Sequence, residues 1–330
     1  MAPPRTAFLF PGAGSFTLRE LHRLLPRAPQ AREQLLILDT VSASYGFEPL
    51  EPVLAAPAPP RNLTPGRHPQ AGEALTFFAS TAAHHIQTSK GMAPDVLMGH
   101  SLGELTALRF AGALSTDAVA RVICERATAL ERSGLPPGGM LALALDARRT
   151  QALLDFYGAP GLALAAVNST DQSVVSGPIQ ALAELECVLE AAFVPAARLD
   201  INGAFHNPLM SEVAQEIAAG CHDLDLRAPH TPVFSPVLGR YIDSASDVSE
   251  VLLHHTDRPV RFLAALLKLH RDGVGTFVEL GGSDALSKFV KSCLPESAVT
   301  VRTPPNRHLK VPVAAQPTNQ HESGASDANT

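Results

Sequence analysis

An apolar run at residues 96–98 ends in a Gly-x-Ser-x-Gly turn, and helical periodicity begins directly after the serine. A strand and a helix can meet at so sharp a corner only where small residues flank it, and Gly99 and Gly103 do so here. Such a corner lies at the carboxyl edge of a sheet, where it exposes the serine and aims free helix N–H groups at it. We therefore interpret Ser101 as a nucleophile. A tight turn whose serine only caps the helix is the alternative.

The same pattern occurs at the start of the chain. Residues 6–10 form an apolar run that ends in a Pro-Gly-Ala-Gly turn, and helical periodicity follows it. Strands that alternate with helices indicate a parallel sheet with helices on both faces. Together with the serine corner, this predicts an α/β fold with an α/β-hydrolase-like large domain.

The order of the predicted elements changes from about residue 138. From there to residue 201 the sequence predicts strand, helix, two strands, helix and strand, which is the βαββαβ order of a ferredoxin-like unit. We therefore expect a large catalytic domain of residues 1–135 and 202–302, with a ferredoxin-like small domain, residues 136–201, inserted into it. Residues 303–330 are polar and rich in Pro, Ser and Asn, and are predicted to be a disordered tail.

The composition excludes several classes of protein. Of 330 residues, 45% are hydrophobic and 18% charged, so the chain can bury a substantial core. A net charge of -6 without a dense Lys/Arg cluster argues against a nucleic-acid partner. No apolar stretch is long enough to span a membrane, and the first residues lack the anatomy of a signal peptide. The four cysteines form no CxxC pair, so we expect no metal site, reduced thiols and a cytoplasmic location.

A serine hydroxyl is a weak nucleophile and needs a base within hydrogen-bond reach. The chain has 13 histidines. His100 directly precedes Ser101, but successive side chains around a sharp turn point apart. His206 follows the last strand of the predicted small domain, where the chain returns to the large one and a cleft between the domains is expected. His206 is therefore the preferred base, and a structural loop histidine is the alternative.

Seven motifs stand in a fixed order along the chain: FLFPGAGS, GHSLGE, ERATAL, VNSTDQSVVSG, GAFHNPLM, RPVRF and FVELGG. In this order and spacing, residues 5 to 300 resemble the malonyl-CoA:acyl-carrier-protein transacylase family, which includes the acyltransferase domains of polyketide synthases. The resemblance implies an acyltransferase of the ACP S-malonyltransferase type in polyketide or fatty-acid biosynthesis. It would move a malonyl-type group from coenzyme A to the phosphopantetheine thiol of an acyl carrier protein. The coenzyme A thioester is the substrate, and no cofactor is implied.

The resemblance also assigns the catalytic roles. Ser101 would carry the acyl group, and His206 would be the general base. Backbone N–H groups of Ala13 and Leu102 would form the oxyanion hole. A main-chain carbonyl orients the histidine in this family, and the matching position here is His255. The nearby Asp257 could instead complete a triad.

The remaining assignments concern the acyl group. Arg126 matches the family arginine that holds the free carboxylate of a malonyl group, for which a guanidinium is a two-pronged partner. Family members that select malonyl tend to carry Ala-Phe-His before the base, and Phe205 here fills the room that an α-methyl would need. His100 and Asn168 are assigned to the same substrate site.

Two departures from the family pattern keep other functions open. Ala13 and Phe16 stand where the family usually has glutamines, and the segment TFFASTAAHHIQ lacks the usual Gln-Pro pair. The alternatives are an acyl-carrier-protein hydrolase and a carrier-to-carrier acyl transferase. A generic serine esterase is less favoured, because it expects an acid between the serine and the histidine in chain order. A docking protein without activity is disfavoured, because Ser101, Arg126 and His206 are all present.

Overall fold

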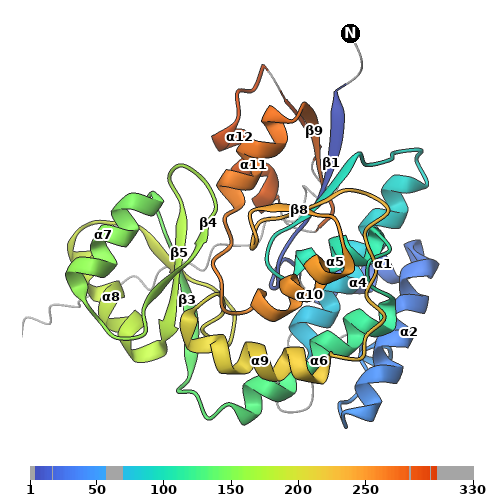
Figure 1. Ribbon diagram of the computed structural model, residues 1–330, viewed down its shortest axis with the longest axis horizontal. Helices are drawn as coiled ribbons and strands as arrows, with labels where there is room; N and C mark the ends of the chain where they lie inside the picture. The colour runs from blue at the N-terminus through green and yellow to red at the C-terminus, as the bar shows by residue number, and fades with distance from the viewer. Residues whose placement is uncertain (1–3, 17, 57–69, 282–283, 298, 303–330) are drawn as a thin grey trace, which may run out of the picture.

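The computed structural model describes residues 4–16, 18–56, 70–281, 284–297 and 299–302. The predicted tail, residues 303–330, lies outside the described residues. Two sheets organise the chain, one of six strands and one of four (Figure 1).

The six-stranded sheet has the order β10-β9-β1-β2-β7-β8. All neighbouring strands are parallel except β8, which runs antiparallel to β7. Its strands are β1 (Arg5–Phe10), β2 (Val96–Gly99), β7 (Val233–Ser235), β8 (Arg240–Ile242), β9 (Val274–Glu279) and β10 (Thr300–Arg302). This parallel-dominated α/β sheet confirms the predicted fold class.

Alternating side chains of the central strands enter two different cores, as the period of a strand requires. Phe8 and Phe10 of β1 pack into one core, whereas Ala7 and Leu9 pack into the other. The first core is covered by α1 (Leu18–Leu24), α2 (Pro29–Ser44), α3 (Glu51–Ala55), α4 (Ala71–Thr88), α5 (Gly103–Phe110), α6 (Thr116–Arg132), α9 (Ser211–Gly220) and α10 (Ala245–His254). The second is covered by α11 (Phe262–Arg271) and α12 (Ala285–Cys293). The sheet is thus buried on both faces.

The four-stranded sheet has the order β4-β5-β3-β6, and every neighbouring pair is antiparallel. Its elements follow the order βαββαβ: β3 (Gly138–Leu143), α7 (Ala147–Tyr157), β4 (Ala163–Val167), β5 (Ser173–Pro178), α8 (Ile179–Ala191) and β6 (Ala196–Arg198). This is the arrangement of a ferredoxin-like unit. One face packs under α7 and α8 (Figure 1). The other face contributes Met140 and Val174 to the second core of the large sheet.

Side-chain caps mark the first turns of α6, α7 and α10. In α6 the Ser115 hydroxyl accepts from the N–H of Ala118. The segment after His206 forms a short 3-10 helix, η2 (Pro208–Met210), followed by α9, and Asn207 caps η2 through its side chain. Among the described residues, no helix has both the length and the apolar character needed to cross a bilayer.

Candidate active site

The serine corner has the geometry that the sequence predicts. Strand β2 ends at Gly99, Ser101 adopts a left-handed φ of 52°, and α5 begins at Gly103. A Cβ on Gly99 would lie 2.0 Å from the backbone nitrogen of Glu104, and one on Gly103 would lie 2.1 Å from the carbonyl oxygen of Phe10. Neither position can hold a side chain, which explains both glycines.

Ser101 and His206 form a hydrogen-bonded pair. The Ser101 Oγ lies 2.7 Å from His206 Nε2, and His206 Nδ1 lies 3.0 Å from the carbonyl oxygen of Arg258. A carbonyl can only accept, so Nδ1 carries the proton and Nε2 accepts from the serine hydroxyl. Burial lowers the pKa of His206 to about 3, because it disfavours the charged imidazolium. At neutral pH the pair therefore holds a neutral, correctly oriented base.

The backbone of His206 is also fixed in an uncommon conformation. His206 has a left-handed φ of 59°, and its N–H donates to the carbonyl of Thr256 at 2.6 Å. The next residue, Asn207, donates to the carbonyls of Gly161 and Ser176 in the four-stranded unit. Left-handed non-glycine residues cost on the order of 1–3 kcal/mol and persist where their surroundings hold them. Both members of the Ser101–His206 pair carry this strain.

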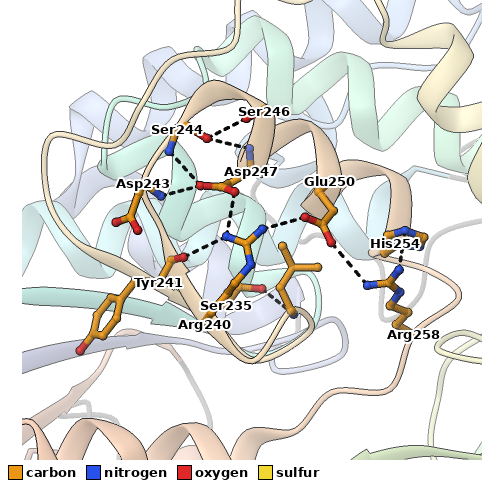
Figure 2. Close-up of polar contacts among 11 residues, drawn as sticks. Ser235, Arg240, Tyr241, Asp243, Ser244, Ser246, Asp247, Glu250, His254 and Arg258 are labelled. Carbon is orange, nitrogen blue, oxygen red and sulfur yellow. Dashed lines mark hydrogen bonds and ion pairs between the residues drawn. The ribbon is translucent and has the colours of Figure 1, made fainter.

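The carbonyl that orients His206 belongs to Arg258 and not to His255, so the predicted position is wrong by three residues. Val260, two residues on, donates to the carbonyl of Ala165 and accepts from the N–H of Val167, which joins this segment to β4. Figure 2 shows the Arg258 side chain between Glu250 and His254 of α10. Hydrogen bonds to β4 and to α10 therefore hold the orienting carbonyl from two sides.

The alternative of a Ser-His-Asp triad through Asp257 is wrong. The carboxylate of Asp257 lies 3.2 Å from Nδ1 of His254. His206 Nδ1 donates to a backbone carbonyl.

His255 has a different place from the one predicted for it. Its Nε2 lies 2.9 Å from the carbonyl oxygen of Ser101, and its Nδ1 lies 2.8 Å from Nη1 of Arg126. Nε2–H donates to the carbonyl and Nδ1 accepts from the guanidinium, which makes the ring neutral. Burial and the charge of Arg126 both hold the pKa of His255 well below its usual value. His255 thus connects Arg126 to the backbone of the nucleophile.

Arg126 is 4% exposed and lies on α6 beside this pair. Its Nη2 lies 2.7 Å from Oε1 of Glu73 and its Nε 2.8 Å from Oε2, so a carboxylate is bound to one edge of the guanidinium. The ring of Phe205 lies against Arg126, 5.2 Å from the guanidinium carbon to the ring centroid. Glu73 lies outside the seven motifs, and no prediction named it. Its place in the first turn of α4 is the signal that could have found it.

The remaining predicted residues surround the corner. His100 Nε2 lies 2.8 Å from Oδ1 of Asn168, whose Nδ2 donates to Gln172. Leu102 is the N-cap residue of α5 and directly follows Ser101, and the N–H groups of the next three residues donate to the carbonyls of residues 100, 101 and 102. Ala13 lies in the turn after β1, and a Cβ on the preceding Gly12 would be 3.4 Å from Cβ of Ser101. Both predicted oxyanion donors therefore belong to segments that border the serine.

The arrangement combines a nucleophile, a neutral base oriented by a carbonyl and a helix N-terminus at the nucleophile. These are the parts that acyl transfer through a covalent intermediate requires. The buried guanidinium of Arg126 is connected to the Ser101 carbonyl through the imidazole of His255. Within the described part of the chain, no three His, Cys, Asp or Glu side chains gather as metal ligands would.

Comparison with known proteins agrees with this geometry. Residues 7–305 match the acyl transferase domain family. The spectinabilin polyketide synthase system protein NorA' of Streptomyces orinoci is 32% identical over 294 residues, which are 89% of this chain and 8% of that protein. The acyl transferase domain of SpnD, solved in complex with 2-(pent-4-yn-1-yl)malonyl, is 30% identical with a TM-score of 0.76, over 91% of this chain and 71% of that one.

A solved transacylase that this chain covers almost completely also has the fold. The malonyl CoA-acyl carrier protein transacylase of Burkholderia pseudomallei is 28% identical with a TM-score of 0.75, over 88% of this chain and 98% of that one. The curated polyketide synthases are far longer, and this chain spans less than a fifth of the first three of them. The family resemblance in the seven motifs is thus confirmed.

Proposed function

Because the chain belongs to the acyl transferase domain family, we propose that it transfers an acyl group from a coenzyme A thioester to an acyl carrier protein. The intermediate is an acyl-enzyme on Ser101. The observation that carries this proposal is the 2.7 Å contact between Ser101 Oγ and the neutral Nε2 of His206. A generic esterase is not supported, because His206 is oriented by a carbonyl and no carboxylate contacts its Nδ1 among the described residues.

In the first half-reaction, Ser101 Oγ attacks the thioester carbonyl while His206 Nε2 takes the hydroxyl proton. The bond from the carbonyl carbon to the coenzyme A sulfur then breaks, and the leaving thiolate takes the proton from Nε2. General base catalysis of this kind is worth roughly 10²–10⁴ in rate. The Arg258 carbonyl keeps the proton of Nδ1 in place throughout, so that Nε2 stays available.

The second half-reaction runs the same chemistry in reverse. The phosphopantetheine thiol of the carrier gives its proton to His206 Nε2 and attacks the acyl-enzyme carbonyl. The bond to Ser101 Oγ breaks, and the serine recovers the proton from Nε2. In both halves the negative charge develops on the carbonyl oxygen, next to the N–H groups of Leu102 and Ala13. Each such donor contributes about 3 kcal/mol in comparable enzymes.

The acyl group that we propose is of malonyl type. Arg126 supports this choice, because it is a buried guanidinium joined to the nucleophile through His255. A desolvated guanidinium recognises a carboxylate with two parallel hydrogen bonds. Phe205 lies against Arg126, and we propose that its ring fills the room that an α-substituent would need.

A transfer assay tests the proposal. The purified chain is mixed with malonyl-CoA and a holo acyl carrier protein, and the acyl-carrier product is measured by mass spectrometry. We expect Ser101→Ala to abolish transfer and His206→Ala to reduce it at least about 100-fold. Ser292→Ala, on the exposed side of α12, is the matched control and should transfer normally. Release of free coenzyme A without acyl-carrier product would indicate hydrolysis and contradict the proposal.

A further inference from the structure

The guanidinium of Arg126 already holds a carboxylate of this chain. Glu73 lies in the first turn of α4, and the Arg126–Glu73 pair closes at 2.7 Å between Nη2 and Oε1. The Glu73 side chain is 17% exposed and that of Arg126 is 5% exposed. The pair is therefore largely removed from water, and Glu73 is the partner that still reaches the solvent.

The hydrogen bonds of Arg126 show what a second carboxylate would meet. Nε and Nη2 donate to Glu73, and Nη1 donates to His255. Nε and Nη2 form one of the two edges with which a guanidinium binds a carboxylate bidentately. An incoming acyl carboxylate thus finds this edge occupied and a negative charge already beside the cation.

We propose that Glu73 is a specificity-determining residue, an internal carboxylate that competes with the carboxylate of the acyl group for Arg126. It weakens the preference of the enzyme for malonyl over uncharged acyl groups. This inference rests on the proposed function, in which Arg126 binds the acyl carboxylate.

The competition acts differently on the two kinds of acyl group. A malonyl group has to displace Glu73 toward water or share Arg126 with it, and either event weakens its binding. An acetyl group leaves the pair intact. Without Glu73, Arg126 is a buried cation with no carboxylate partner in the free enzyme and stays so when an acetyl group binds, whereas a malonyl group supplies the missing partner. Glu73 therefore disfavours the charged group relative to the uncharged one.

The experiment compares acylation of the full chain by malonyl-CoA and by acetyl-CoA. The initial rate of coenzyme A release gives kcat/KM for each thioester, and the measured quantity is the malonyl-to-acetyl ratio. We expect Glu73→Gln to raise this ratio at least about tenfold, mainly through a lower KM for malonyl-CoA. Glu125→Gln is the charge-matched control, because Glu125 is the neighbour of Arg126 on α6 but pairs with the hydroxyl of Tyr45. Its ratio should stay within about twofold of wild type.

Two further variants secure the interpretation. In an Arg126→Ala background, Glu73→Gln should no longer change the malonyl-to-acetyl ratio, because the guanidinium for which the two carboxylates compete is absent. If Glu73→Gln does not fold by circular dichroism, Glu73→Asp, which shortens the reach to Arg126, should shift the ratio in the same direction. An unchanged or lower ratio in a folded Glu73 variant would overturn the inference. The proposed function fails separately, if wild type forms no Ser101 acyl-enzyme with either thioester.

Discussion

The low pKa of His206 makes a quantitative prediction about pH. A histidine with the ordinary pKa of about 6.5 would be only about 3% neutral at pH 5, and acylation would fall about 30-fold from its value at pH 7.5. With the pKa of His206 lowered to about 3, roughly 99% of the enzyme keeps a neutral base at pH 5. We therefore expect the rate of Ser101 acylation to change less than twofold between pH 7.5 and pH 5.

The assay is single-turnover acylation with acetyl-CoA, whose acyl group does not titrate in this range, followed by acid quench and intact-mass measurement. A fall of tenfold or more in a protein that remains folded would refute the assignment of a deeply buried neutral base. The fold has to be monitored at each pH, because the same shift destabilises the native state in acid. A lowered folded-state pKa means that the unfolded chain binds the proton more readily, so stability is present above pH 6.5 and is lost as the pH falls.

That loss can be estimated for the histidines. At pH 5 an unfolded histidine binds a proton that buried His206 cannot, which costs the native state about 2 kcal/mol relative to pH 7.5. His84, whose pKa burial lowers to about 4, adds a similar amount. We expect the midpoint of urea unfolding to fall accordingly between these pH values. Circular dichroism at each pH therefore shows whether a loss of acylation rate comes from unfolding or from protonation of His206.

Two further predictions concern stability. Burial raises the pKa of Glu104 to about 8, so between pH 4.5 and 8 the native state has to keep a proton that the unfolded chain releases. Glu104→Gln should therefore raise the free energy of unfolding by about 3 kcal/mol at pH 7 but by less than about 1 kcal/mol at pH 5, as measured by urea titration. An equal gain at both pH values would contradict the raised pKa of Glu104. Gly103→Ala should destabilise the chain by about 3 kcal/mol or more, because its Cβ would lie 2.1 Å from the Phe10 carbonyl, whereas Gly72→Ala, with open space around it, should not. Equal unfolding midpoints for these two variants would argue against the tight approach of α5 to β1.

The sequence predicts those parts of the site that require a particular residue type at a particular position. The corner at Ser101 can be predicted because only glycine fits at Gly99 and Gly103. His206 is identified by its place after the four-stranded unit. The orienting carbonyl of Arg258 leaves no such trace, because every residue carries a carbonyl and only the packing of the segment decides which one faces the imidazole. This explains the three-residue error that assigned the role to His255.

Tertiary pairing accounts for the other differences. Glu73 and Arg126 are 53 residues apart in the chain, and only the packing of α4 beside α6 brings them together. Strands β8 and β10, with three residues each, are too short to show a period of two, and hydrogen bonds to β7 and β9 define them.

In the proposed function, Ser101 carries the acyl group because His206 removes its proton. The most direct measurement is the mass of proteolytic fragments after brief exposure of the chain to malonyl-CoA and acid quench. We expect the acyl group on the fragment that contains Ser101 in wild type, and almost none on the same fragment of His206→Ala at equal times. An acyl group on another residue, or equal labelling in the two proteins, would contradict it.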